Sequence, residues 1–252
     1  MEIVNFQKDS EQSGLRLVAD KKKQVIEHRG FEKQFINFQF LCVNTRWRRL
    51  EPEHKAELKE EFQTVFDGFR SSFLLFTYSL VGFDSKADLM FWRIGTSLDL
   101  VQEMTSAINR TGLGSYLDTV DNYLSTTKNM MFVPGDAADR FHVPAGQKKY
   151  HFLYPCSKHK DWYEKSSEER AALVEENFMV GKRFSNISIH MTHAFGFSER
   201  EYIISFETDE PRDFLALAEE LMHTPASRFT LRGMPIYTCR QRTLSECLDS
   251  LG

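Results

Sequence analysis

Two segments of this 252-residue chain carry the same order of predicted elements. In residues 31–127 and again in residues 148–243, apolar β-rich runs alternate with helical periods in the order β-α-β-β-α. Landmark residues recur at a nearly constant offset, which by subtraction is 115 positions for Trp47 and Trp162, and 114 for Gly82-Phe83 and Gly196-Phe197. The chain is therefore predicted to contain two copies of one structural unit.

The repeated unit has the element order of a ferredoxin-like fold, in which two helices cover one face of an antiparallel sheet. The opposite face of such a sheet is bare, and two tandem copies can bury their bare faces against each other. We therefore predict an α+β fold, in which the tandem duplication forms an antiparallel β-barrel-like core covered by helices. The 22 phenylalanines of the chain suit a large core of this kind.

Composition divides the rest of the chain. Residues 1–30 are polar and show no sustained period, which is typical of an extended arm. The segment 128–147 contains two prolines and two glycines, and we interpret it as a linker. The predicted order is an N-terminal arm (1–30), a first repeat (31–127), the linker (128–147), a second repeat (148–243) and a C-terminal tail (244–252).

Charge and motif content exclude several classes of function. The chain has 32 basic and 36 acidic residues, so it lacks the positive charge that favours nucleic-acid binding. Its four cysteines form no Cys-x-x-Cys pair, which disfavours a thiolate metal site and fits a reducing cytoplasm. No window approaches the roughly 20 apolar residues of a membrane span. The sequence also has no phosphate-binding glycine loop, no Gly-x-Ser-x-Gly elbow and no His-Glu-x-x-His helix.

One polar residue interrupts the apolar stripe of a helix predicted in the second repeat. Leu173, Val180 and Phe184 share a face at helical spacing, and Asn177 completes that face. The Asn177 amide is therefore expected to face the core or a pocket, where it either bonds to a backbone group or lines a ligand site.

Two histidines of the following strand point to opposite faces of the sheet. The two-residue period of a strand places Met191 and His193 on one face and His190 on the other. The two histidines cannot hold one metal ion together without a bulge. We expect one of them to face the core between the repeats and the other to face the covering helices.

A phenol and an ammonium group lie at the end of the first strand of the second repeat. Tyr154 shares a face with Tyr150 and Phe152, and Lys158 follows in a loop after Pro155. At the mouth of an aromatic barrel this pair would suit a flat anionic ligand. A surface lysine beside a packed tyrosine is the alternative interpretation.

The order and spacing of several short motifs resemble the chlorite dismutase and coproheme decarboxylase family over roughly residues 31–240. These motifs are Tyr-Pro-Cys-Ser-Lys at 154–158, Asp161-Trp162-Tyr163, Glu168-Glu169-Arg170, the segment from Thr192 to Phe197, and Phe206-Glu207-Thr208-Asp209. The resemblance implies a haem-binding oligomer, usually pentameric, that holds the porphyrin in its C-terminal repeat.

The decarboxylase branch of this family converts iron-coproporphyrin into haem b with peroxide, through a tyrosyl radical that removes hydrogen from a propionate. The resemblance assigns the radical-forming role to Tyr154 and a propionate contact to Lys158. Cys156 replaces the methionine of the family's motif.

The axial histidine of the family does not occur in this chain. In the family, a histidine in a Glu-His-x-x-x-Gly context binds the iron, and here Asn177 occupies that position between Glu176 and Gly181. A neutral amide oxygen is a poorer ligand for haem iron than an imidazole. His190 stands where chlorite-dismuting members have an arginine and many decarboxylases a glutamine, which disfavours chlorite dismutation.

These substitutions leave three alternatives for the iron. His190 could bind it from the opposite face of the porphyrin, the haem could be held by propionate contacts and shape with weak ligation, or the cavity could have lost haem altogether. The leading hypothesis is a cytoplasmic coproheme decarboxylase-like oxidoreductase. In it, Tyr154 forms the radical, Lys158 anchors a propionate, His190 is a distal base or replacement ligand, and Asn177 lines the porphyrin pocket. The competing hypothesis is a haem-free or porphyrin-binding oligomer without redox turnover.

Overall fold

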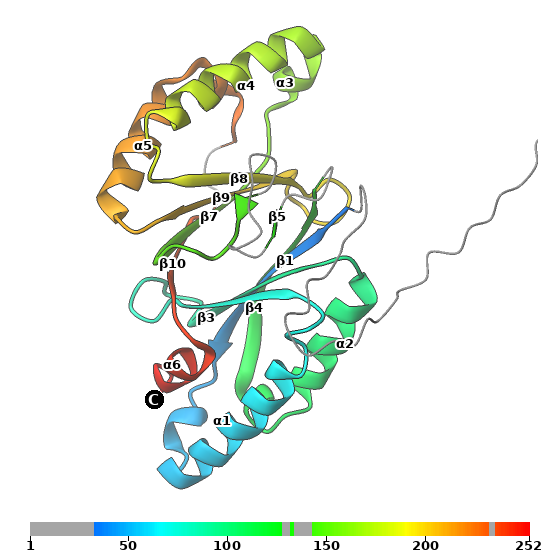
Figure 1. The fold of residues 1–252 in the computed structure, drawn as a ribbon, viewed down its shortest axis with the longest axis vertical. Helices are drawn as coiled ribbons and strands as arrows, with labels where there is room; N and C mark the ends of the chain where they lie inside the picture. Colours follow the sequence, from blue (N-terminus) through cyan, green and yellow to red (C-terminus); the bar gives the residue numbers. More distant parts are fainter. Residues whose placement is uncertain (1–32, 128–131, 134–142, 232–234) are drawn as a thin grey trace, which may run out of the picture. The chain divides into compact units, whose positions relative to one another are not determined.

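The structure is a computed structural model that describes residues 33–127, 132–133, 143–231 and 235–252 (Figure 1). The arm predicted for residues 1–30 lies outside the described residues, as does most of the predicted linker. Within that linker the structure describes a short parallel pair of strands, β5 (Phe132–Val133) and β6 (Val143–Pro144). The division of the chain into arm, repeats and linker stays a prediction.

Each half contains the predicted strands and helices and adds a fourth strand. The first half consists of β1 (Phe35–Val43), α1 (Pro52–Asp67), β2 (Leu74–Ser79), β3 (Leu89–Gly95), α2 (Leu98–Asn109) and β4 (Leu117–Thr126). The second half consists of β7 (Tyr150–Cys156), α3 (Lys160–Glu164), α4 (Ser167–Lys182), β8 (Ser188–His193), β9 (Tyr202–Thr208), α5 (Pro211–His223), the 3₁₀ helix η4 (Pro225–Phe229) and β10 (Tyr237–Gln241). The sequence pattern did not predict β4 and β10, because the first part of β4 is largely exposed and polar and β10 is short.

Local sequence explains where several elements begin and turn. Ser166 and Glu169 form a reciprocal capping box at the start of α4. Pro52 occupies the first position of α1, where a missing N–H breaks no helical hydrogen bond. The hairpin residues Gly82 and Gly196 have φ angles of 80° and 78°, which glycine adopts without strain. None of the helices in the described residues is long and apolar enough to cross a membrane.

Eight of the described strands close into one barrel, in the order β1-β3-β2-β10-β7-β9-β8-β4. Each half contributes four neighbouring strands, and the pairs are antiparallel. The halves join where β10 pairs with β2 and where β4 pairs with β8. Helices α1 and α2 lie outside the first-half strands, and α4 and α5 lie outside the second-half strands (Figure 1). The predicted fold, a duplicated unit around a barrel, is confirmed.

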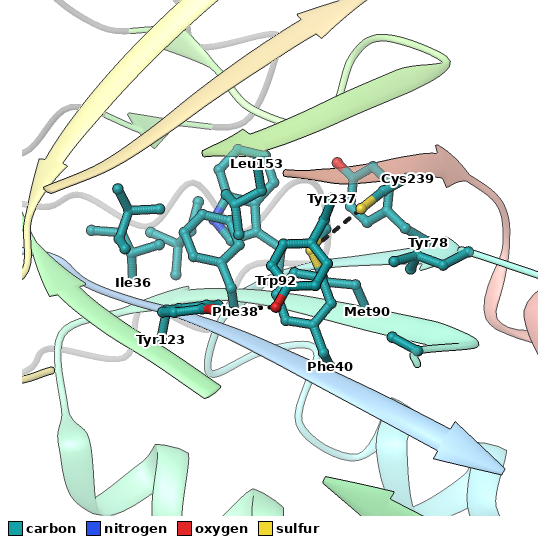
Figure 2. Packing of buried hydrophobic residues seen from close by; sticks show 14 of the residues in the cluster. Ile36, Phe38, Phe40, Tyr78, Met90, Trp92, Tyr123, Leu153, Tyr237 and Cys239 are labelled. Atoms are coloured by element: carbon teal, nitrogen blue, oxygen red, sulfur yellow. Dashed lines mark hydrogen bonds between the residues drawn. The ribbon is translucent and has the colours of Figure 1, made fainter. Parts of the chain in front are cut away.

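The bare sheet faces of the two halves meet inside this barrel (Figure 2). Phe40 of β1 stacks on Tyr237 of β10 with ring centroids 3.9 Å apart, and the Tyr237 hydroxyl lies 3.2 Å from that of Tyr123. The same buried cluster includes Ile36, Phe38, Tyr78, Met90, Trp92, Leu153, Ile203 and Cys239. Since these side chains come from both halves, the barrel core holds the duplicated units together.

One buried polar residue, His151, lies among these rings. The imidazole of His151 is fully buried, with its centroid 4.8 Å from the Trp92 ring and 5.2 Å from the Tyr78 ring. Neither of its ring nitrogens has a hydrogen-bond partner among the described residues. Burial, with a smaller contribution from nearby His190, lowers the pKa of His151 to about 3.

The last residues, for which the sequence predicts a C-terminal tail over residues 244–252, form a short helix. In α6 (Leu244–Asp249), the side chains of Leu244, Cys247 and Leu248 are buried in the cluster that also contains residues of α1 and α2. The Trp47 indole Nε1 donates a 2.8 Å hydrogen bond to the carbonyl oxygen of Gly252. A segment of fewer than two helical turns is too short for its apolar period to be recognised in the sequence.

The buried His151 predicts a pH-dependent stability. Its pKa is about 3 in the folded protein and about 6.5 in an unfolded chain, so below pH 6.5 the unfolded state binds the extra proton. The contribution of His151 is therefore fully present above pH 6.5. As pH falls from there toward 3, the free energy of unfolding should decrease by about 1.4 kcal/mol per pH unit.

Replacement of the imidazole tests this assignment. His151→Phe keeps a planar ring but should remove this part of the dependence of the unfolding free energy on pH. His54→Phe, at an exposed position of α1, should retain that dependence. Urea unfolding between about pH 7 and pH 4.5 measures both slopes. Equal slopes in wild type and His151→Phe would contradict the burial of a neutral imidazole.

The packing of α6 predicts a large effect of a single substitution. Leu248 is 1% exposed, so Leu248→Ala should lower the free energy of unfolding by about 2–5 kcal/mol. Ser245→Ala, at an exposed position of the same helix, should change it by less than about 0.5 kcal/mol. Chemical denaturation compares the two variants, and similar midpoints would mean that α6 is not part of the core.

Candidate functional site

The second-half sheet has an inner face toward the barrel core and an outer face toward α4 and α5. Along β7, Tyr150, Phe152 and Tyr154 point outward, and Phe152 stacks on Phe214 of α5 with centroids 3.9 Å apart. The strand register extends this outer face in rows across β7, β9 and β8, namely Tyr154–Ile204–Met191 and Phe152–Phe206–Ile189. Residues in one row point to the same side of the sheet.

The residues that the structure describes leave the β8 part of this outer face partly exposed. Ile189 and Met191 are 40% and 45% exposed although they lie inside the strand. The corresponding first-half strand, β2, is covered by α6: Leu75 packs against the α6 cluster, and Thr77 Oγ1 donates a 2.6 Å hydrogen bond to the carbonyl oxygen of Arg242. Because α6 covers β2, no described segment after β10 covers β8 in the same way.

Helix α4 lies beside this uncovered strand and contacts it near one end. The two elements run in opposite directions (Figure 1). At the C-terminal end of α4, a side-chain carbon added to Gly181 would lie 2.9 Å from Ile189 Cδ1. From Gly181, four residues toward the N-terminus of α4 span about 6 Å. From Ile189, two residues toward the C-terminus of β8 span about the same distance in the same direction. By this count, Asn177 and Met191 are at corresponding positions along the two elements.

We call the surface formed by Asn177, Met191 and their neighbours Tyr154, Ile189 and His193 the α4–β8 surface. Asn177 is half-buried, and its Oδ1 atom is a buried acceptor for which the described part of the chain offers no hydrogen-bond partner. The predicted stripe of α4 does face the sheet, as Val180 and Phe184 pack against the outer cluster, but Asn177 makes no backbone bond through Oδ1. An unpaired buried acceptor costs about 1–3 kcal/mol, which a bound ligand could offset.

Exposed apolar side chains adjoin Asn177 on its solvent side. Val174 and Phe178 of α4 are 46% and 54% exposed, and they lie three positions before and one position after Asn177. Together with Ile189 and Met191, they form an apolar surface that water contacts. Such a surface around one polar acceptor suits a flat and mainly apolar molecule.

Tyr154 lies on the same side of the sheet as this apolar surface. It is half-buried and occupies the same cross-strand row as Met191, with Ile204 between them. Two inter-strand spacings amount to about 10 Å, which is comparable to the width of a large aromatic ring system. A molecule lying against β8 and β9 could therefore bring one edge to the Tyr154 phenol.

The ammonium group of Lys158 is held at the end of β7. Its Nζ donates a 2.8 Å hydrogen bond to Thr230 Oγ1 and lies 4.8 Å from the ring centroid of Trp162, and its backbone N–H donates to Glu201 Oε2. Burial lowers the pKa of Lys158, because desolvation disfavours the charged form. An anionic ligand group beside Nζ would favour the charged form and would be bound by it.

The structure gives the position of His190, whose expected role stays a prediction. His190 lies on the inner face of β8, where its side chain is 1% exposed, its Nε2 lies 3.1 Å from Glu207 Oε2 and its ring is 6.4 Å from that of Trp92. A molecule held against α4 would meet the outward residues Met191 and His193, because alternate residues of a strand face opposite sides. His190 would therefore not contact a molecule bound on the α4 side of β8.

The structure thus brings Tyr154 and Asn177 to one surface, places Lys158 at the end of the same sheet, and separates His190 from all three. Sequence periodicity had already grouped Met191 with His193, whose ring lies 5.6 Å from that of Tyr202. It could not identify their face as the one toward α4, because both faces of β8 carry apolar and polar residues. Among the described residues, no three His, Cys, Asp or Glu side chains are arranged to bind a metal ion.

Comparison with known proteins identifies the family. Residues 55–242 match the family model described as chlorite dismutase. The chain belongs to the chlorite dismutase family. The matched region includes every barrel strand except β1, and every residue of the α4–β8 surface.

Two curated relatives are decarboxylases. The coproheme decarboxylase of Mycolicibacterium smegmatis is 26% identical over 167 residues, which cover 64% of this chain and 70% of that protein. The coproheme decarboxylase of Oceanobacillus iheyensis is 24% identical over 197 residues, which cover 70% of this chain and 78% of that protein. Among solved structures, a mutant chlorite dismutase from Candidatus Nitrospira defluvii matches with a TM-score of 0.78 and 23% identity, covering 86% of this chain and 95% of that one. This structural likeness shows the fold.

The unpaired Asn177 acceptor predicts that the ligand-free protein gains stability from an apolar residue at this position. Asn177→Leu replaces the buried amide by a side chain of similar size and should raise the free energy of unfolding by about 1–3 kcal/mol. Glu176→Leu, at the exposed neighbouring position, should change it by less than about 0.5 kcal/mol. Thermal and urea unfolding measure both, and a less stable Asn177→Leu protein would show that the amide has a structural partner.

Proposed function

We propose that this protein is a coproheme decarboxylase-like oxidoreductase that binds iron-coproporphyrin on the α4–β8 surface. The observation that carries the proposal is the uncovered outer face of β8, where apolar residues surround the buried acceptor of Asn177. The two decarboxylase relatives support the choice of substrate.

The residues of this surface fit a porphyrin in most respects. Ile189, Met191 and Phe178 offer apolar contacts for a flat macrocycle, and Lys158 offers an ammonium group for a propionate. The fit is incomplete at the iron, because α4 presents the Asn177 amide where an imidazole would be a stronger ligand. When bound, the iron porphyrin would supply the activation of peroxide.

In this proposal Tyr154 supplies the group that is oxidised and then removes hydrogen from a propionate. Each propionate that becomes a vinyl group loses CO₂ and two electrons, and one hydrogen peroxide takes up those electrons with protons to give two water molecules. The half-buried position of Tyr154 limits its contact with solvent, which favours reaction with a bound substrate over side reactions.

Lys158 would position the substrate in this reaction. Thr230 and Trp162 fix the direction of its ammonium group before a ligand binds, so less side-chain entropy is lost on binding. Its lowered pKa follows from burial, and a carboxylate beside it would reverse that shift.

The second candidate is a porphyrin-binding protein without redox turnover. The amide at Asn177 favours it, since a weak iron ligand binds the macrocycle with little control over the chemistry of the metal. Under this alternative, the same surface binds the tetrapyrrole and Tyr154 is only a packing residue.

Titration with iron-coproporphyrin followed by hydrogen peroxide separates these candidates. We expect a change in the Soret absorption band on binding. After peroxide is added, we expect the porphyrin to lose CO₂, which mass spectrometry detects as a loss of mass. Tyr154→Phe should reduce product formation to the level seen with free porphyrin and peroxide, without changing the affinity for iron-coproporphyrin. Tyr150→Phe, on the same strand and face, should remain active.

Lys158→Met should weaken binding about tenfold to a hundredfold through loss of a charge-assisted bond, and the exposed Lys160→Met should not.

Each result has a definite consequence. Binding without product would favour the non-catalytic candidate, and unchanged turnover in Tyr154→Phe would remove that residue from the mechanism. If no tetrapyrrole binds, the proposed function is wrong. A cytoplasmic homopentamer is part of the same proposal, and light scattering after size exclusion tests the subunit number.

A further inference from the structure

A cleft of about 590 Å³ lies where the end of α5 and the helix η4 meet the loop that leads into α3. Its volume falls in the range of about 300–1,000 Å³ that is typical of small-molecule sites. The residues that line it include His159, Met222, His223, Arg228, Thr230 and Leu231. None of them belongs to the α4–β8 surface, so the cleft is a separate place on the second half of the chain.

Backbone hydrogen bonds hold one wall of this cleft. The His159 N–H donates a 2.7 Å bond to the carbonyl oxygen of Phe229, and the Leu231 N–H donates a 3.0 Å bond to the carbonyl oxygen of Ser157. The loop before α3 and the segment after η4 are therefore fixed against each other.

The opposite wall is held by the cap of α5. The Thr224 hydroxyl donates a 2.7 Å bond to the carbonyl oxygen of Leu221, and the Ser227 hydroxyl donates a 2.8 Å bond to that of Met222. Because these last carbonyls of the helix already accept hydrogen bonds, the negative end of α5 is partly neutralised beside the cleft.

The lining of the cleft is basic. It contains Arg228, His223 and His159, and none of the described residues that line it is acidic. Asp161 lies nearby, with its Oδ1 atom 3.2 Å from His159 Nδ1. Within the part of the chain that the structure describes, Arg228 and His223 have no carboxylate in ion-pair contact, although Arg183 beside the same helix is paired with Glu220. The cleft therefore presents positive charge and N–H donors that the described residues leave uncompensated.

Thr230 adds a hydroxyl donor, and two apolar side chains complete the lining. Thr230 Oγ1 accepts a 2.8 Å hydrogen bond from Lys158 Nζ, so the hydroxyl proton of Thr230 remains to donate to a ligand. Met222 and Leu231 are 53% and 37% exposed and offer apolar contact to the rest of a bound molecule. Donors from α5, η4 and the segment after η4 approach from several directions, which suits a tetrahedral oxyanion, and a guanidinium group matches phosphate geometry well.

We propose that this cleft binds a small organic phosphate. Arg228, His223 and Thr230 donate hydrogen bonds to the phosphate oxygens, and Met222 and Leu231 contact the organic part. The inference goes beyond the proposed function, because the cleft needs neither a porphyrin nor iron in order to bind such a molecule.

Isothermal titration calorimetry of the full chain, without any porphyrin, tests this site with four probes at constant ionic strength. Phenyl phosphate carries both the oxyanion and an apolar ring, inorganic phosphate carries only the oxyanion, phenol carries only the ring, and benzoate replaces the phosphate by a carboxylate. We expect phenyl phosphate to bind at one site per chain and more tightly than inorganic phosphate. Benzoate should bind more weakly than phenyl phosphate, and phenol should not bind.

Four variants at exposed positions separate the contributions to binding. Arg228→Gln should weaken the binding of both phosphates about tenfold to a hundredfold, and His223→Gln about twofold to tenfold. Met222→Ala should weaken the binding of phenyl phosphate and leave that of inorganic phosphate unchanged. Arg212→Gln is the matched control, since Arg212 lies at the other end of α5, about 16 Å along the helix, and should change neither affinity.

The outcomes decide the inference independently of the decarboxylase proposal. Absence of binding by both phosphates, or equal affinities in wild type and Arg228→Gln, would overturn it. An equal loss of affinity in Arg212→Gln would show a general effect of charge rather than a site, and benzoate binding as tightly as phenyl phosphate would overturn the choice of phosphate. Circular dichroism of each variant verifies that it is folded, so that a loss of affinity reports on the cleft.

Discussion

The mutual burial of two bare sheet faces determines most of this structure. Each half has helices on one side of its sheet, so the other side must find an apolar partner, and the second copy of the unit provides it. The short joints β10–β2 and β4–β8 then close the sheets into a barrel. Once the barrel is closed, alternation along each strand decides which residues are enclosed in the core and which can meet a ligand.

Duplication alone would give two equivalent outer surfaces, and α6 makes them different. In the first half, Leu248 and its neighbours fill the space outside β2, and Arg93 is buried in hydrogen bonds with Asn37 and Gln39 on that side. In the second half, the corresponding strand keeps Ile189 and Met191 exposed. The C-terminal helix therefore closes one surface and leaves the other available, which explains why the candidate site belongs to the second half.

The sequence was informative where a feature is periodic and repeated. The duplication, the barrel core and the inward stripe that contains Asn177 could all be predicted, because periods of 2 and 3.6 residues report directly which face is buried. It was less informative for short elements, and α6, β4 and β10 were missed for this reason. For His190 the alternation was right, but the choice between inner and outer face depends on how β8 pairs with β4 and β9, which the pattern of one strand does not contain.

Helix α4 shows how the open surface and local stability are linked. Its capping box and charged residues favour a helix, but Gly181 is its single fully buried residue and three of its apolar side chains, Val174, Phe178 and Met179, face solvent. Packing on the sheet therefore contributes little to its position except at the last turns, where Val180 and Phe184 join the outer cluster. A ligand bound on the α4–β8 surface would add contacts along the rest of the helix. Binding and the docking of α4 should then be thermodynamically coupled, since a molecule that binds the docked form stabilises it.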